Sequence, residues 1–193
     1  MRQFIWIVVP AAAVIGFACG GSSSTSPSSG RGALTVMMKD SPFTDAKALL
    51  VTFSDVSVHR ADQADSAWTK VPFPGGATSR TCDLKKLQTA QDILGTGELA
   101  TGHYTQVRLT VSNAALYFDT ASVGAACAPA IVAPAGRSAV VDVPSGEVKL
   151  NREFDITGAT TTMLVDFDGD RSVRETGNNR YLMTPVIGVV SVQ

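Results

Sequence analysis

The chain has 193 residues, of which 45% are hydrophobic and 17% are charged, and its formal net charge at pH 7 is -1. This length predicts one domain with appended segments, and the composition argues against a largely disordered chain. Nucleic-acid binding is also excluded, because it depends on clustered Lys and Arg, and the sequence has no basic stripe.

The first 18 residues are typical of an export signal. Arg2 supplies a positive charge, and an apolar run extends from Phe4 to Phe17. This run is too short to span a bilayer, which needs roughly 20 apolar residues, but it fits the hydrophobic region of a signal peptide. Ala18 then precedes Cys19, and two glycines follow. This arrangement resembles the lipobox of bacterial lipoproteins, whose cysteine is alkylated by a diacylglycerol before cleavage.

The resemblance to a lipobox has two departures. Leu usually stands three residues before the cysteine, where this chain has Gly16, and Phe17 is bulky for its position. The alternative is an ordinary secretory signal in which Cys19 has no special role. Lipidation is favoured because the next segment, GGSSSTSPSSGRG, is a flexible tether with a reach of roughly 20 Å. We expect a signal peptide over residues 1–18, a tether over 19–31 and an exported domain over 32–193.

The first part of the exported domain has the alternation of β-strands. Leu34, Val36 and Met38 share one face of the first predicted strand. In the second, over residues 51–58, the apolar face switches near Ser54, which predicts either a β-bulge or two strands in one run. A short strand follows over residues 68–71 and ends at Pro72, and the Pro-Gly-Gly at 74–76 predicts a turn.

One segment has helical spacing. Leu84, Leu87 and Leu94 fall on one face of a helix over residues 84–94, with Asp83 as the N-cap and Gly95 just beyond the end. Residues 102–111 then form the clearest strand. Tyr104 follows Gly102 near the start of this strand, a pattern that resembles the tyrosine corner of Greek-key sandwiches; the alternative is a Tyr at a sheet edge.

Four further strands are predicted over residues 138–143, 148–156, 161–168 and 181–192. Many short strands and one short helix indicate an all-β fold, an antiparallel β-sandwich with an immunoglobulin-like or prealbumin-like Greek key. Cys82 and Cys127 remain after Cys19, and an even pair in an oxidising compartment favours a disulfide. Its loop of about 45 residues would contribute about 4 kcal/mol in the chain-entropy model. The alternative is two buried free thiols.

Five sequence segments of the exported domain resemble segments of the bacterial domain of unknown function 4382 lipoprotein family and occur in the same order as in that family. They are GALTVMMKDSPFTDAKALLVTFSDVSVHR, a lone Trp68, TCDLKKLQ, LATGHYTQVRLTVSNA and DFDGDRSVRETGNNRYLMTPVIGVV. The resemblance extends from about residue 32 to residue 190. It implies an all-β extracytoplasmic domain in a family without an established activity, and it supplies no catalytic residue.

Three carboxylates are candidate metal ligands. Asp166 and Asp168 would share the outer face of one strand, and Asp170 follows Gly169. Carboxylates this close repel each other, so a cation should compensate them. Ca²⁺ is one candidate, since it prefers carboxylate oxygens. The other is a structural cluster with nearby arginines, Arg171, Arg174 and Arg180. An EF-hand is excluded, because its sixth and twelfth positions hold Arg171 and Gly177.

A second acidic pair, Asp40 and Asp45, flanks a Ser-Pro. It is typical of a turn, with the alternative that this loop joins Asp166 and Asp168 at one end of the sandwich. The two histidines, His59 and His103, have no zinc-site spacing and are expected at the surface.

An aromatic group is a further candidate for binding. Trp68, Phe73 and Tyr117 are either core and loop anchors or a platform on which sugars stack.

No catalytic motif occurs in the chain, so we expect no cofactor except possible Ca²⁺ and assign no catalytic residue. The sequence predicts a membrane-anchored exported lipoprotein facing the periplasm or cell surface, which binds or presents an envelope protein or glycan. The alternatives are an envelope hydrolase that acts on glycans through surface carboxylates and a calcium-stabilised adhesion domain.

Overall fold

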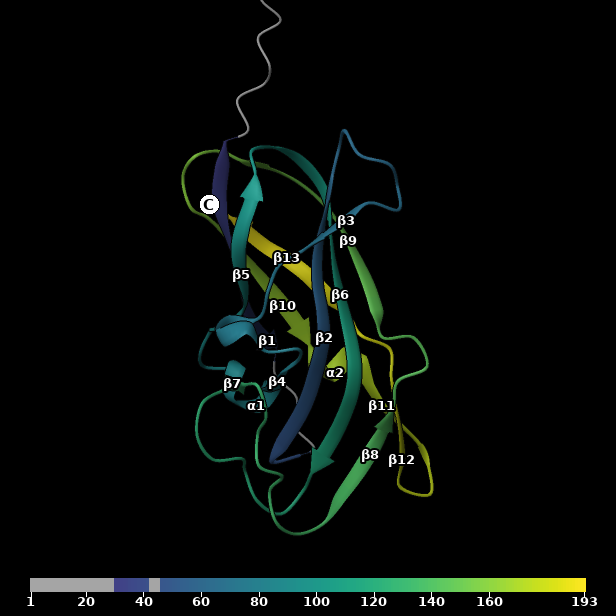
Figure 1. The fold of residues 1–193 in the computed structure, drawn as a ribbon. Helices are drawn as coiled ribbons and strands as arrows, with labels where there is room; N and C mark the ends of the chain where they lie inside the picture. Colours follow the sequence, from purple (N-terminus) through teal and green to yellow (C-terminus); the bar gives the residue numbers. More distant parts are fainter. Residues whose placement is uncertain (1–29, 42–45) are drawn as a thin grey trace, which may run out of the picture.

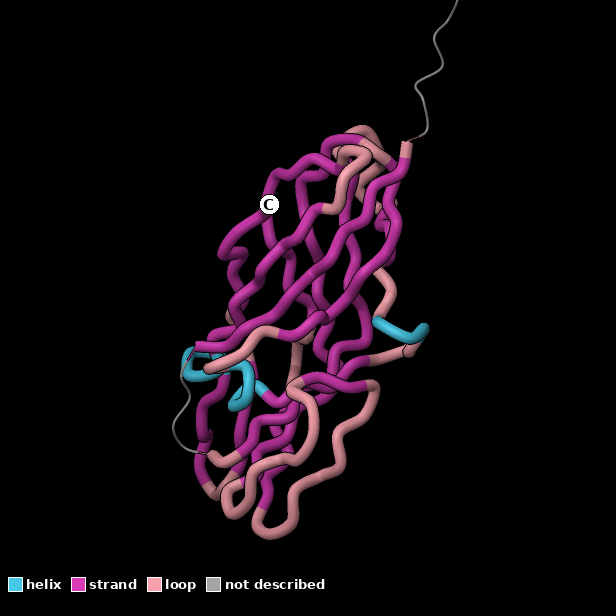
Figure 2. Tube along the Cα trace, turned by 90° about the vertical axis from the view of Figure 1, so that its left-hand side faces the viewer, coloured by secondary structure: helices cyan, strands magenta, loops and turns pink. Residues whose placement is uncertain are grey.

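Thirteen strands form two sheets in the part of the chain that the computed structural model describes, residues 30–41 and 46–193. The predicted signal peptide, most of the tether, Cys19 and Asp45 lie outside these residues. Figures 1 and 2 show the two sheets lying face to face. The predicted all-β sandwich is confirmed. Within the described ranges, no helix is long and apolar enough to cross a membrane.

The smaller sheet has four strands in the order β13-β10-β1-β5. Their bounds are β13 Ile187–Val192, β10 Thr161–Asp168, β1 Arg31–Ser41 and β5 Asp92–Ala100. β1 and β10 are parallel, whereas the other pairings in this sheet are antiparallel. Parallel neighbours need a long crossover connection, and here the chain between β1 and β10 contains most of the second sheet.

The larger sheet is built on two long strands, β2 and β6, which pair along almost their whole length. Its main order is β11-β12-β8-β6-β2-β4-β7, with β3 also paired to β2 and β9 also paired to β6. The bounds are β2 Ala48–Arg60, β3 Trp68–Lys70, β4 Arg80–Asp83, β6 Gly102–Tyr117, β7 Cys127–Ala128, β8 Ser138–Asp142, β9 Glu147–Ile156, β11 Val173–Gly177 and β12 Arg180–Met183. β8 and β12 are parallel, so both sheets are mixed.

The core lies between the two sheets and is made by alternate residues of their strands. Leu34, Val36 and Met38 of β1 are fully buried, as the alternation predicted. Phe167 of β10 meets Phe53 of β2 edge to face, with ring centroids 6.2 Å apart. The switch of face near Ser54 is a β-bulge, because the pairing of β2 with β6 shifts register on both sides of Phe53.

The predicted helix over residues 84–94 is wrong beyond its first turn. α1 is Leu84–Leu87, with the Asp83 side chain accepting from the amide of Lys85 as the predicted N-cap. The chain then forms β5, in which Leu94 is fully buried and Gly95 lies against Pro72 and Val71. Pairing with β1 gives these residues a ladder of backbone hydrogen bonds and a buried face, whereas a helix of three turns is only marginally stable without tertiary packing.

The C-terminal region also differs from the prediction of one strand over residues 181–192. β12 and β13 belong to different sheets, and Pro185 lies between them. β11, which the predicted set lacks, forms a hairpin with β12 through Asn178 and Asn179, both in the left-handed region. A second four-residue helix, α2 (Gly169–Ser172), follows β10.

The tyrosine corner is confirmed. The hydroxyl of Tyr104 donates to the backbone carbonyl of Ala100 over 2.9 Å, and the ring is buried and stacked on Phe154. This bond ties the start of β6 to the end of β5, so it joins the two sheets at one end of the sandwich.

Candidate functional site

Carboxylates gather where β1 and β10 end. In this parallel pair Lys39 is opposite Asp166, Asp40 is opposite Phe167 and Ser41 is opposite Asp168. Asp40 continues the inward-facing row of β1, and only 4% of it is exposed. The alternative in which the loop after β1 joins the acidic run is therefore confirmed for Asp40.

Asp40 is held by groups from two other elements. Its Oδ1 accepts from the backbone N–H of Gly169 at the start of α2, over 3.0 Å, and its Oδ2 accepts from Nε2 of Gln88 after α1, over 3.4 Å. Burial is the main cause that raises the pKa of Asp40 to about 7; the charges of Asp166 and Asp168 act in the same direction, and the two hydrogen bonds oppose the shift. The carboxyl group therefore links β1 to α2 and to the segment after α1. Its charge changes near neutral pH.

The three predicted metal ligands have different surroundings. Lys39 Nζ lies 2.8 Å from Asp166 Oδ2. Asp168 accepts from the backbone N–H of Arg171, over 2.9 Å, and so caps α2. Asp170 is exposed. Across residues 30–41 and 46–193, no group of three or more His, Cys, Asp or Glu side chains is placed to hold a metal ion. Ca²⁺ binding stays the untested alternative to a structural role for these carboxylates.

The alternative of an Asp–Arg cluster holds for one arginine only. Arg171 lies 3.9 Å from Asp168, whereas Arg180 lies 3.5 Å from Asp142 on β8. Lys39 is the cation that sequence reasoning missed. Its position opposite Asp166 follows from the parallel pairing of two strands far apart in the chain, and local sequence contains no signal of that pairing.

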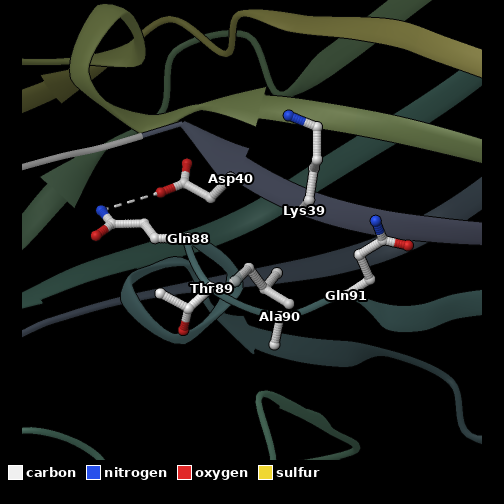
Figure 3. A pocket seen from close by; sticks show the side chains of 7 residues that line it. Lys39, Asp40, Gln88, Thr89, Ala90 and Gln91 are labelled. Carbon is white, nitrogen blue, oxygen red and sulfur yellow. Dashed lines mark hydrogen bonds between the residues drawn. The ribbon is translucent and has the colours of Figure 1, made fainter.

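A shallow hollow of about 460 Å³ lies beside Asp40. Its wall is the segment after α1, with Gln88, Thr89, Ala90 and Gln91, as Figure 3 shows. In this view Gln88 points toward Asp40, and the dashed line marks their hydrogen bond. Asp40 contributes a carboxyl group whose two oxygens both accept hydrogen bonds from the chain itself.

A different group of side chains surrounds Trp68 on the outer face of the larger sheet. Trp68 pairs with His59 across β3 and β2, and their ring centroids are 5.4 Å apart. The guanidinium of Arg108 on β6 lies 4.4 Å from the centre of the indole ring, and the indole N–H donates to the carbonyl of Asp65 over 3.2 Å. His59 is only 8% exposed. The expectation that it lies at the surface is wrong, because these neighbours cover it.

The aromatic platform of Trp68, Phe73 and Tyr117 is also wrong as a group of three. Trp68 pairs with His59 near the C-terminal end of β2, whereas Tyr117 pairs with Ala48 at its first residue. Eleven residues of strand separate these two positions, at about 3.3 Å per residue. Phe73 is buried. Of these three side chains, Trp68 is therefore separate from the other two.

The predicted disulfide is present between Cys82 on β4 and Cys127 on β7, which lie directly opposite each other. It pins the long segment between β6 and β8. The same segment is held by Ser122, whose hydroxyl donates to Asp83 over 2.6 Å, and by Asp92, whose carboxylate accepts from the amide of Cys127 over 2.9 Å. The bond therefore fastens a loop of small residues to the edge of the sheet.

Comparison with known proteins identifies the family. The family described as "Domain of unknown function (DUF4382)" matches residues 31–185, which include every strand from β1 to β12. No curated protein and no solved structure matches the chain. The match covers most of the 193 residues, and the chain therefore belongs to the DUF4382 family of domains of unknown function.

Proposed function

We propose that this chain is an exported lipoprotein, anchored to a membrane by lipid on Cys19, whose β-sandwich binds a partner at the cell envelope and catalyses no reaction. The lipobox-like residues and the Gly/Ser tether support the anchor. The domain begins at β1, whose first residue, Arg31, pairs with Ala100 at the end of the sandwich that carries the tyrosine corner. A lipid-anchored domain would be tethered at that end.

The observation that carries the non-catalytic assignment is the bonding of the carboxylate cluster. Hydrolysis of a glycoside by paired carboxylates needs one acid and a second carboxylate that acts as base or nucleophile, both facing the substrate. Here Asp166 pairs with Lys39, Asp168 caps α2, and Asp40 is buried with hydrogen bonds to both oxygens. These groups hold strand and helix ends in place, which supports a structural role for the cluster.

A hydrolase screen tests this assignment. The chain from residue 19 onward, with Cys19→Ser to keep it soluble, is assayed on chromogenic glycosides, esters, phosphate esters and peptidoglycan. The matched variants Asp40→Asn and Asp168→Asn are assayed beside it. We expect no turnover above that of the two variants. Turnover that either substitution abolishes would establish the envelope hydrolase instead.

A further inference from the structure

A hollow of about 480 Å³ lies on the outer face of the larger sheet, between the segment 61–67 that joins β2 to β3 and the strands β6 and β9. Figure 1 shows β3 and β9 near the same end of the domain as the start of β1. The volume of the hollow is within the range of small-molecule binding sites, roughly 300 to 1,000 Å³. Trp68 forms the main apolar surface of this hollow, and the other side chains around it are almost all polar.

The indole of Trp68 is fixed before any ligand arrives. Its N–H donates to the carbonyl of Asp65, and its ring contacts Arg108 and His59, with Lys149 Nζ 5.8 Å from the ring centre. His59 is itself fixed, with Nε2 3.1 Å from the carbonyl of Ala64 and Nδ1 3.4 Å from the hydroxyl of Thr105. A ring held in this way loses little conformational entropy on binding, which favours affinity.

The rim of the hollow offers both donors and acceptors. Gln63 and Asp65 come from the segment before β3, Gln106 comes from β6 and Lys149 comes from β9. Gln106 is positioned by a 2.9 Å hydrogen bond from its Nε2 to Asn151, which leaves its second amide hydrogen and its carbonyl oxygen to bond a ligand. Polar groups from three separate segments thus converge around one aromatic surface.

The charges around the hollow nearly cancel. Lys149 and Asp65 are the basic and acidic residues on the rim besides His59, and Lys149 lies 3.4 Å from Glu147. A phosphate or polyanionic ligand would need an excess of positive charge here. A peptide that adds a strand would need a long exposed edge, whereas β3, at the border of the hollow, has three residues. The chemistry favours an uncharged ligand with one apolar face and hydroxyl groups along its edges.

A pyranose ring has this chemistry. Its axial C–H groups form an apolar face that can lie on an indole, and its hydroxyls both donate and accept hydrogen bonds around the ring. We propose that the hollow beside Trp68 binds a neutral glycan, with one pyranose ring lying on Trp68 and its hydroxyls bonded by Gln63, Gln106 and Lys149. This inference rests on the proposed binding function and names its ligand class.

Intrinsic fluorescence gives a direct assay, because Trp6 and Trp68 are the two tryptophans of the chain and Trp6 lies in the predicted signal peptide. The chain from residue 19 onward with Cys19→Ser is titrated with cellotetraose, maltotetraose and the tetramer of N-acetylglucosamine. Inorganic phosphate and a heparin oligosaccharide are the anionic probes, and calorimetry repeats each titration. We expect at least one neutral tetrasaccharide to change the Trp68 emission saturably and to bind more tightly than either anion.

Variants connect that binding to the hollow. Trp68→Ala should weaken it by at least about tenfold, as for a central aromatic contact, and Gln106→Ala should weaken it less. Tyr117→Ala, at the other end of β6, is the matched control and should bind as the parent does. Thermal melting verifies that each variant is folded. Binding of no neutral sugar, binding that survives Trp68→Ala, or tighter binding of the anions would each overturn the proposal. Turnover in the hydrolase screen is a separate result. It would overturn the non-catalytic assignment and leave glycan binding at Trp68 to be judged by the titrations.

Discussion

Replacing Asp40 with Asn removes a buried negative charge and keeps a side-chain oxygen that can accept from the amide of Gly169. The pKa of Asp40 is about 7 in the folded protein, whereas the ordinary value of an aspartate, which applies to the unfolded chain, is 3.8. The folded chain therefore binds this proton more tightly than the unfolded chain, so the stabilisation is complete below about pH 4 and is lost as the pH rises through 7. The two pKa values differ by about 3, which corresponds to a total loss of about 4 kcal/mol.

Urea unfolding followed by Trp68 fluorescence measures this effect. Between pH 5 and pH 8 the free energy of unfolding of the parent chain should fall by about 3 kcal/mol more than that of Asp40→Asn, because the variant has no carboxyl group to ionise at this position. Taking the difference between the two chains cancels the titration of the other groups, including the histidines. Asp170→Asn, at an exposed position in the same region, is the matched control and should follow the parent. An equal loss in Asp40→Asn and the parent would refute the reasoning.

Three further predictions concern the rest of the domain. Replacing Cys82 and Cys127 with Ala should lower the free energy of unfolding by about 4 kcal/mol, as measured by urea, because their bond closes a loop of 45 residues; an unchanged urea midpoint would contradict this. Tyr104→Phe removes the corner hydrogen bond and should cost about 1 kcal/mol in the same assay, whereas no loss would show the bond to be dispensable. Calcium should leave the melting midpoint unchanged, since Asp166 and Asp168 already have partners within the chain; a rise that Asp166→Asn abolishes would establish a calcium site.

Local patterns were sufficient to predict several of the strands and turns. The alternation in β1 and β10 predicted both strands and their inward residues, and the switch at Ser54 predicted the bulge in β2. The Gly-x-Tyr at the start of β6 predicted the tyrosine corner. In these cases the side chains that decide the structure are close together in the sequence, so their spacing contains the information.

The remaining features depend on contacts between distant segments. Leu94 fits a helix by spacing, but β5 forms because β1 offers it a partner edge, and no local signal describes that edge. Asp40 looked like a turn residue beside Pro42, whereas its burial follows from the parallel pairing with β10. The hollow at Trp68 likewise combines residues from three segments. Asp40 and Trp68 could be singled out from the sequence, whereas the residues around them, Lys39, Gln88 and Gln106, and the assembly of each site, could not.

The intact mass of the mature protein, purified from the membrane fraction of bacterial cells that express it, tests the central proposal of a lipid-anchored module most directly. We predict a chain that begins at Cys19 and carries the added mass of a diacylglycerol, and we predict that Cys19→Ser removes both the lipid and the membrane association. A mature chain of unmodified mass, or one whose cleavage leaves Cys19 within the released peptide, would contradict the account.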